Sequence, residues 1–332
     1  MLSTYQAGKV VLLSAVDADN LVQLNRSFQR PMGITEDPAT DRLAIACAQE
    51  VLILRNAPNL AYDYPKAPKR YDALYVPRLT YHTGSLDIHD LRFGDGGRSL
   101  YAVNTLFSCL VQLNDQYSFT PVWQPGWIDK LMPEDRCHLN GMAMRDGQPA
   151  FVTAFSTSNT PQGWRDTVTT SGVIVDVKSN EVIVDGVAMP HTPRWYDGKL
   201  YVLQTAKGLL STVDINSGKL TTVSKVGGFV RGMAKVGDYV FVATSKLRKN
   251  SSTFAKLDFA KAADRAGITV IHLPTGAKVG EMVYASSVDE IYDVHILTGK
   301  RRVNILNTLG GTHRAALTSP KMDFWGSVDE SE

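Results

Sequence analysis

The sequence is poor in cysteine, in net charge and in long apolar runs. Its 332 residues include three cysteines, Cys47, Cys109 and Cys137, and none of them stands in a CxxC motif. Three thiols cannot all pair, so we expect no disulfide framework, and reduced thiols favour a cytoplasmic protein. The formal net charge of +2 provides no strong field for a nucleic-acid backbone or an anionic membrane surface. The N-terminal apolar stretch at 10–13 has only the length of a strand, so we expect neither a signal peptide nor a membrane span.

The chain also has little of the spacing that marks amphipathic helices. Short runs of alternating apolar residues, bounded by Gly, Asp and Asn, predict an all-β protein instead. One unit recurs, consisting of a short strand, a turn and a second strand. Its six copies span residues 30–48, 88–105, 139–155, 191–205, 230–245 and 291–308. When the copies are aligned, one position is occupied by Gly33, Asp90, Gly141, Pro193, Gly232 and Asp293. Small or turn-forming residues there suit a point where backbones converge.

A second unit, a hairpin with a tight polar turn, lies between these copies. It occurs at 51–64, 109–123, 172–186, 209–225 and 268–284, and its Asn-Ser-Gly and Pro-Thr-Gly turns suit hairpin reversal. A sixth hairpin, residues 9–28, precedes the first copy, whereas the last copy has none after it. We therefore predict a six-bladed β-propeller whose N-terminal outer hairpin pairs with the C-terminal inner strands.

The propeller is expected to occupy residues 1–316 as a single domain, followed by a surface tail at 317–332. A long β-sandwich or two small barrels are the alternatives, but neither explains why the unpaired units sit at opposite ends of the chain. Five or seven blades would result if one repeat were misread.

Long segments between strands are predicted at 61–86, 123–137, 155–171 and 246–267. The order of the repeat places all four on one face, and insertions on one face of a repeat fold usually build its binding surface. Residues 254–266 have helical spacing and are expected to form a short helix in this cap.

The inner strands begin at the same face, so their polar side chains should converge at the mouth of the central channel. The predicted ligand-binding residues are His89, Asp90, Asn104, Arg136, His138, Asn140, Trp164, Arg165, His191, Arg194, Arg231 and Asp293. The candidates for catalytic roles are His89, His138, His191 and Arg231.

The histidines and arginines each have a structural alternative. A divalent metal held by Asp90 and the three histidines is the one cofactor suggested, but no HxH, HExxH or CxxC spacing supports it, which favours satisfied channel histidines. Arg136, Arg194 and Arg231 could clamp a carboxylate, phosphate or sulfate. They could equally pair with nearby acidic residues.

Two residues of the loops have alternatives of the same kind. Trp164, followed by Arg165, stands in a loop rich in Ser, Thr and Gly, where we expect it to stack on a sugar or flat ligand rather than to pack. Cys137 lies between Arg136 and His138 and could be a nucleophile, although a buried, inert thiol is the commoner case.

Several motifs resemble a family of conserved bacterial propeller-like proteins of the TIGR03032 or DUF4915 type. They include STYQAGKVVLL (3–13), DIHDL (87–91), NTLFSCL (104–110), PEDRCHLNGMAM (133–144), GWR (163–165), MPHTPRW (189–195), FVRGMA (229–234) and SKLR (245–248). The resemblance runs from about residue 3 to about residue 298. It implies the fold and the location of the site, and it implies no particular activity.

The architecture is also similar, more distantly, to gluconolactonase-like and strictosidine-synthase-like propellers. That similarity implies a divalent ion at the channel mouth and hydrolysis of lactones or esters. Asn104, Asn140, Asp90 and Asp293 would take the parts of the ligands. The first blade departs from the pattern because Met32 stands where a Glu ligand would be convenient, so calcium is not expected.

The function predicted first is binding of a small polar or anionic ligand, such as a sugar, peptide or carboxylate, at the loop-capped mouth. A metal-assisted hydrolase or lyase acting at the same mouth is the first alternative. A scaffold that binds protein partners through the loop face is the second. No nucleic-acid partner is expected.

Overall fold

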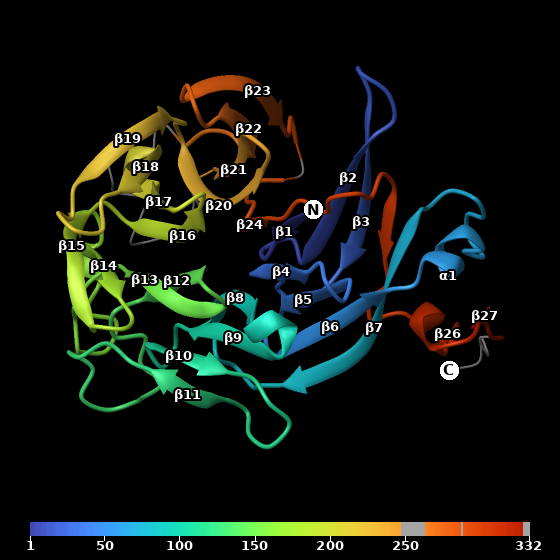
Figure 1. Ribbon diagram of the computed structural model, residues 1–332, viewed down its shortest axis with the longest axis horizontal. Helices are drawn as coiled ribbons and strands as arrows, with labels where there is room; N and C mark the ends of the chain where they lie inside the picture. Colours follow the sequence, from blue (N-terminus) through green and yellow to red (C-terminus); the bar gives the residue numbers. More distant parts are fainter. Residues whose placement is uncertain (247–262, 287, 328–332) are drawn as a thin grey trace.

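The computed structural model describes residues 1–246, 263–286 and 288–327, and within them six sheets surround one axis (Figure 1). Each sheet runs from an inner strand at the axis to an outer strand at the rim. The chain is therefore a six-bladed β-propeller, as its repeat predicts. None of the helices in these described ranges is long and apolar enough to span a bilayer.

The blades are numbered in chain order of their inner strands, and their strands follow from the axis outward. Blade 1 consists of β4 (Ile34–Asp37), β5 (Arg42–Ala46), β6 (Glu50–Asn56), β7 (Ala73–His82) and β25 (Val303–Ile305). Blade 2 consists of β8 (Ile88–Gly94), β9 (Ser99–Asn104), β10 (Cys109–Gln112) and β11 (Thr120–Trp123). Blade 3 consists of β12 (Leu139–Arg145), β13 (Gln148–Ala154), β14 (Gly172–Asp176) and β15 (Glu181–Val187).

The remaining blades follow the same order. Blade 4 consists of β16 (Pro190–Tyr196), β17 (Lys199–Gln204), β18 (Leu209–Val213) and β19 (Leu220–Lys225). Blade 5 consists of β20 (Phe229–Val236), β21 (Tyr239–Ser245), β22 (Gly267–His272) and β23 (Ala277–Val283). Blade 6 consists of β24 (Asp293–Val294), β1 (Leu2–Thr4), β2 (Lys9–Ala15) and β3 (Leu21–Ser27).

Helical structure in the described residues is limited to short segments. They are α1 (Pro58–Tyr62) and the 3-10 turns η1 (Asp95–Gly97), η2 (Arg165–Thr167), η3 (Thr205–Lys207) and η5 (Gly311–Ala315). A separate hairpin, β26 (Ala316–Thr318) with β27 (Asp323–Trp325), lies beside α1 at the rim (Figure 1). Trp325 of this hairpin donates a hydrogen bond to the Leu60 carbonyl and contacts the ring of Tyr64.

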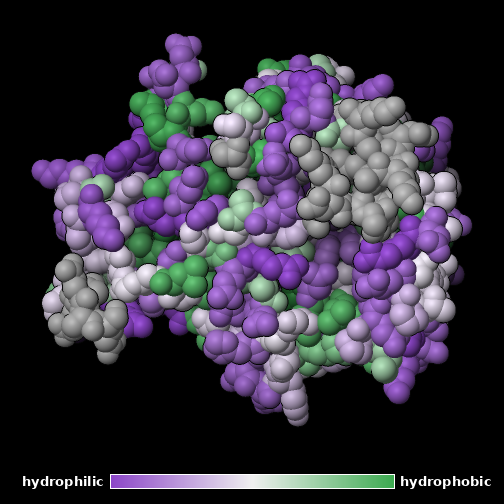
Figure 2. Space-filling view, turned by 180° about the vertical axis from the view of Figure 1, so that it is seen from behind, coloured by the Kyte–Doolittle hydropathy of each residue, from purple (hydrophilic) through white to green (hydrophobic). Residues whose placement is uncertain are grey.

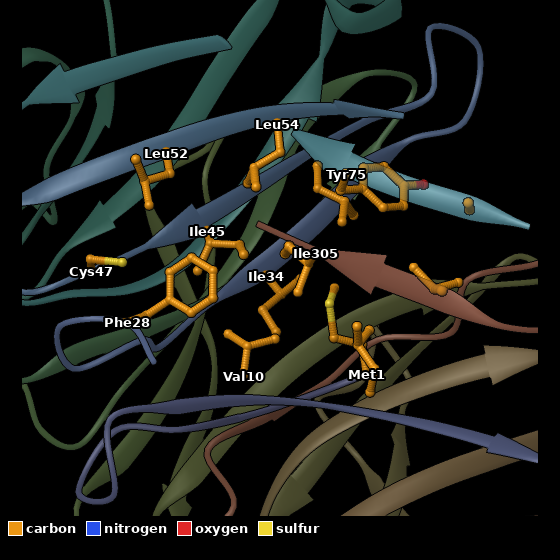
Figure 3. Close-up of a cluster of buried hydrophobic side chains, with 14 residues drawn as sticks. Met1, Val10, Phe28, Ile34, Ile45, Cys47, Leu52, Leu54, Tyr75 and Ile305 are labelled. Carbon is orange, nitrogen blue, oxygen red and sulfur yellow. The ribbon is translucent and has the colours of Figure 1, made fainter. Parts of the chain in front are cut away.

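Apolar side chains of adjacent blades interdigitate to form the core. Between blades 6 and 1, Val10, Ile34, Ile45 and Leu52 pack together with Ile305 of β25 (Figure 3). Each of these side chains is at most 1% exposed. Burying one such aliphatic side chain contributes roughly 1.5–3 kcal/mol to the stability of the fold. The apolar side chains that alternate along the strands therefore stabilise the packing of neighbouring blades.

The aligned position of the repeat is the point where neighbouring inner strands approach most closely. A Cβ on Gly33 would lie 2.8 Å from Leu91, and one on Gly232 would lie 2.6 Å from the Cα of Asp293. Gly232 also has a φ of +26°, which side chains rarely adopt. Only glycine fits these places, and the neighbouring blade fills the space instead.

Closure of the ring differs in detail from the prediction. The outer hairpin of blade 6 is the predicted N-terminal one, β2 with β3, but the N-terminus also supplies β1 as the second strand. The C-terminal segment contributes only the innermost strand, β24, and its second half forms β25, which pairs in parallel with β7 of blade 1. A strand of three residues such as β1 shows too little alternation to be recognised.

One long insertion also lies on the other face. The fourth strand of blade 1 is β7, so the segment at 57–72 joins strands three and four rather than two blades. The prediction that 61–86 caps the mouth was therefore wrong, because α1 interrupts a segment that looked like an outer hairpin. The loops at 123–137 and 155–171 do lie on the predicted face. Most of 246–267, with most of the predicted helix at 254–266, falls outside the described residues.

Candidate ligand site at the propeller axis

Two aspartates each link two inner strands that are neighbours around the axis. Asp90 on β8 accepts hydrogen bonds of 3.0 Å from the backbone N–H groups of Leu91 and of Met142 on β12. Asp293 on β24 accepts equivalent bonds of 2.9 and 3.0 Å from Val294 and from Ile34 on β4. Burial raises the pKa of Asp293 to about 6. Both carboxylates thus accept hydrogen bonds from backbone N–H groups at places where the strand pairing is irregular.

Arg194 on β16 fills the same layer. Its guanidinium donates to Asp90 at 2.7 and 3.3 Å and also to the carbonyl oxygens of Met142 and Pro193. Burial alone would lower the pKa of Arg194, but the Asp90 carboxylate raises it above its ordinary value. We predicted Asp90, Arg194 and Asp293 as ligand-binding residues. The structure shows their polar groups bonded to the protein itself, so a ligand-binding role of these three residues stays a prediction.

Nearer to the loop face lies a group that we call the axial cluster, formed by His89, His191, Arg231 and Tyr292. Tyr292 is at its centre. The centroid of its ring lies 5.8 Å from that of His89 and 5.9 Å from that of His191. The Arg231 guanidinium lies over the same ring at 5.3 Å. Four side chains from blades 2, 4, 5 and 6 are thus brought together, and three of them were predicted from the sequence.

The backbone beside the histidines is unusual. Asp87, Asp135, His138, Met189 and Thr192 all have φ between +47° and +53°. This left-handed region is strained for residues other than glycine and is found preferentially at functional sites.

His138 joins the axial cluster to the loops. Its ring lies 4.8 Å from that of His89, edge to face, and its Nδ1 contacts both oxygens of Asp135 at 3.1 Å. Trp164 donates a 3.0 Å hydrogen bond to the same carboxylate and covers the imidazole at 4.3 Å. Phe155 stacks on His138 at 4.6 Å. The loops at 123–137 and 155–171 therefore hold this histidine in place.

Three polar atoms of the axial cluster are buried without a hydrogen-bond partner among the described residues. They are Nε2 of His191, Nε of Arg231 and the hydroxyl of Tyr292. Buried polar groups are nearly always hydrogen-bonded to protein, water or a ligand. Their convergence therefore marks a place for a group that is not part of this chain.

Electrostatics make the axial cluster positive. Burial, aided by the charge of Arg231, lowers the pKa of His191 well below its usual value, and burial also lowers that of His89. Burial raises the pKa of Tyr292 well above its usual value. Both histidines and the tyrosine are therefore neutral near pH 7, and arginine carries its charge at every physiological pH.

The charge of Arg231 is not compensated locally. Its side chain is 8% exposed, and its contacts are with the ring faces of Phe229 and Tyr292 at 5.0 and 5.3 Å. In the part of the chain that the structure describes, no carboxylate lies within ion-pair distance of its guanidinium. A buried charge without a partner costs several kcal/mol.

The predicted loop residues have structural roles. Arg136 donates to Asp129 and Glu134 at 2.7 and 2.8 Å, away from the axial cluster. Trp164 is 3% exposed and packs in a small core, so our expectation of a stacking platform was wrong. Arg165 is exposed and lies over the Trp164 ring at 4.6 Å.

The two predicted asparagines differ in how far the protein satisfies them. Asn104 accepts a hydrogen bond from the backbone of Phe107, but its Nδ2 is buried without a hydrogen-bond partner among the described residues. Asn140 accepts a hydrogen bond from the Thr153 hydroxyl, and its Nδ2 donates to the carbonyl of His138. Burial raises the pKa of Cys137 to about 12, so its thiol is inert. Among the described residues, no group of three or more His, Cys, Asp or Glu side chains could hold a metal ion.

Tyr292 and Asp135 are the site residues that sequence reasoning missed. A signal for Tyr292 was available, because it directly precedes Asp293, as His89 precedes Asp90 and Arg231 precedes Gly232. Aromatic residues at such positions are easily read as core. Asp135 stands in a loop, where spacing carries no information about contacts.

Comparison with known proteins agrees with this architecture. Residues 1–306 match the model of a family described as a domain of unknown function, DUF4915. The chain belongs to the DUF4915 family. The match ends after β25 and does not include the hairpin β26–β27. The resemblance to the DUF4915 motifs is thereby confirmed, and the TIGR03032 resemblance stays a prediction.

Solved structures show what the DUF4915 chain is similar to. A chain of a nidogen/laminin complex superimposes with a TM-score of 0.56 at 8% identity, over 88% of this chain and 95% of that one. A structural genomics protein of unknown function from Bacteroides thetaiotaomicron gives a TM-score of 0.46 at 10% identity, over 85% and 66%. No curated protein matches the chain. The first likeness supports the propeller fold and says nothing about function.

Proposed function

We propose that this propeller binds a small anionic ligand, with a carboxylate group, at the axial cluster. The observation that carries the proposal is Arg231, a buried cation whose Nε has no hydrogen-bond partner among the described residues. A water molecule would satisfy the Nε2 of His191 and the hydroxyl of Tyr292, but it would leave the charge of Arg231 uncompensated. An anion supplies both acceptors and charge.

A carboxylate suits this geometry better than a larger anion. Arginine binds carboxylates through two parallel hydrogen bonds. The ring faces of Phe229 and Tyr292 hold the guanidinium in one orientation. The Tyr292 hydroxyl, neutral near pH 7, supplies a further donor. The donors are thus fixed before the ligand arrives, which reduces the entropy that binding costs.

The surface gives no separate support to a protein-binding scaffold. On the face that Figure 2 shows, apolar residues lie in several separate patches among hydrophilic ones. A scaffold would present one large apolar area. The scaffold and the metal-assisted enzyme stay predictions from the sequence.

The test is thermal-shift screening at pH 7 against propionate, succinate, L-lactate, D-glucuronate and D-galacturonate, in a halide-free buffer and with neutral D-glucose as the reference. A ligand at one hundred times its Kd stabilises the protein by about 2.7 kcal/mol. Isothermal titration of the compounds that shift Tm would then give Kd values.

The decisive comparison uses two arginine variants. Arg231→Met should weaken binding about 30-fold or more, since losing one partner of a buried charged pair costs about 2–5 kcal/mol. Arg165→Met removes an exposed arginine from the same face and should leave binding unchanged. The proposal fails if no carboxylate binds, or if both variants bind as the wild type does.

A further inference from the structure

The hydrogen bonds of His89 fix which of its ring nitrogens carries the proton. Nδ1 lies 2.9 Å from the carbonyl oxygen of Asp87, which can only accept. Nδ1 also lies 2.8 Å from the Thr105 hydroxyl, whose own hydrogen is donated to the Leu139 carbonyl at 2.6 Å. Both partners therefore accept from Nδ1, which must be protonated.

The other nitrogen of His89 is consequently a hydrogen-bond acceptor. A neutral imidazole with a proton on Nδ1 has a lone pair on Nε2. This Nε2 makes no hydrogen bond to the described residues. His138 is oriented by the same device, because the Asp135 carboxylate only accepts from its Nδ1.

The axial cluster thus has an acceptor side beside a donor side. Arg231 can only donate, whereas His89 Nε2 can only accept. Both side chains lie against the same ring, since His89 is 5.8 Å and Arg231 is 5.3 Å from Tyr292. A bare carboxylate, a halide or a sulfate would satisfy Arg231 but would leave the acceptor side unpaired.

From this contrast we infer that the ligand is a hydroxylated carboxylate, the class to which sugar acids belong. Its carboxylate binds Arg231 and Tyr292, and one of its hydroxyl groups donates a hydrogen bond to His89 Nε2. The inference rests on the proposed function and specifies its ligand class.

The expected discrimination follows from the cost of an unmade hydrogen bond. Leaving one buried acceptor unpaired costs about 1–3 kcal/mol, which corresponds to a roughly 5- to 150-fold change in Kd. An apolar analogue of the same size and charge should therefore bind at least fivefold more weakly. A neutral sugar should bind more weakly still, because it leaves Arg231 uncompensated.

The experiment is isothermal titration of the full chain at pH 7 with matched ligands. D-glucuronate and D-galacturonate are compared with cyclohexanecarboxylate, which has the ring and the carboxylate but no hydroxyl groups. D-gluconate is compared with hexanoate, and D-glucose provides hydroxyls without the carboxylate. We expect at least one hydroxylated carboxylate to bind five- to 150-fold more tightly than its deoxy partner.

A variant assigns the preference to His89. In His89→Leu the hydroxylated ligand should lose most of its advantage, while cyclohexanecarboxylate should bind about as in the wild type. If that variant does not fold, the comparison of hydroxylated and deoxy carboxylates in the wild type still tests the preference for hydroxyl groups. Equal or tighter binding of the deoxy carboxylates overturns the inference and leaves the proposed function standing. Binding of no carboxylate at all overturns both.

Discussion

Replacing Arg231 with methionine should make the ligand-free protein more stable. Methionine keeps an unbranched, apolar stem of similar length and removes the buried charge, whose desolvation costs several kcal/mol. The change also removes two contacts with the ring faces of Phe229 and Tyr292, each of which contributes about 0.5–2 kcal/mol. The net gain should be about 1–3 kcal/mol.

The gain can be converted into a change in Tm. Unfolding entropy is about 2.1 cal/mol/K per residue, which over 332 residues amounts to about 0.7 kcal/mol/K. A stabilisation of about 2 kcal/mol should therefore raise Tm by about 3 °C. Differential scanning calorimetry of the dialysed, ligand-free proteins measures this directly.

Arg194→Met is the matched control, because Arg194 lies at the same axis but is bound to Asp90 at 2.7 Å. Removing one partner of a buried ion pair costs about 3–5 kcal/mol, so this variant should lose about 4–7 °C. If Arg231→Met is destabilised to the same degree, Arg231 has an anionic partner within the protein, and the reasoning is refuted.

Three further predictions test other parts of the structure. The pKa of Asp293 is about 6 in the folded protein and about 3.9 in the unfolded chain. Between these values the folded protein binds more protons than the unfolded chain, so its free energy of unfolding falls as the pH rises from about 4 to 6. Asp293→Asn removes this loss, so its stability relative to the wild type should rise by about 2 kcal/mol between pH 4 and pH 7 in urea titrations; a constant difference would contradict it. Gly141→Ala places a Cβ against Pro193 of the next blade and should cost about 1–3 kcal/mol by the same titration, whereas an unchanged midpoint would show that the inner strands are not in close contact. Trp164→Ala should cost about 3–5 kcal/mol because Trp164 is core, and a neutral effect in calorimetry would restore it as a ligand platform.

The arrangement of blades could be predicted because each blade repeats the same physical solution. Short runs of alternating apolar residues mark the strands, and glycines such as Gly33 and Gly232 stand where a Cβ has no space. These signals are local in sequence and recur six times. They locate the axis without any knowledge of long-range contacts.

The predictions were wrong where the structure is locally irregular. The insertion at 57–72 was assigned to the wrong face because α1 resembles the continuation of a hairpin. The segment that forms β25 was predicted to be a strand of blade 6. It pairs instead with β7 of blade 1, because the N-terminal strand β1 is the second strand of blade 6. Such choices depend on pairing between distant segments, which alternation does not encode.

For the site, the sequence indicated which residues meet but not which of them lack a partner. Arg194 and Arg231 each stand next to the aligned position of the repeat, and the hydrogen bonds between Arg194 and Asp90 show which of the two arginines is paired. Trp164 seemed to have no core around it, because its apolar neighbours come from other blades and loops. Hydrogen-bond satisfaction is a property of three-dimensional contacts, and it decided the interpretation.

The most direct test of an anion at the axial cluster is a crystal structure of the protein soaked in bromide, whose anomalous scattering identifies it. We expect a bromide peak at hydrogen-bond distance from Nε of Arg231, beside His191 Nε2 and the Tyr292 hydroxyl, and no such peak in Arg231→Met. A carboxylate of the protein lying against the Arg231 guanidinium, or bromide at surface positions alone, would contradict the account.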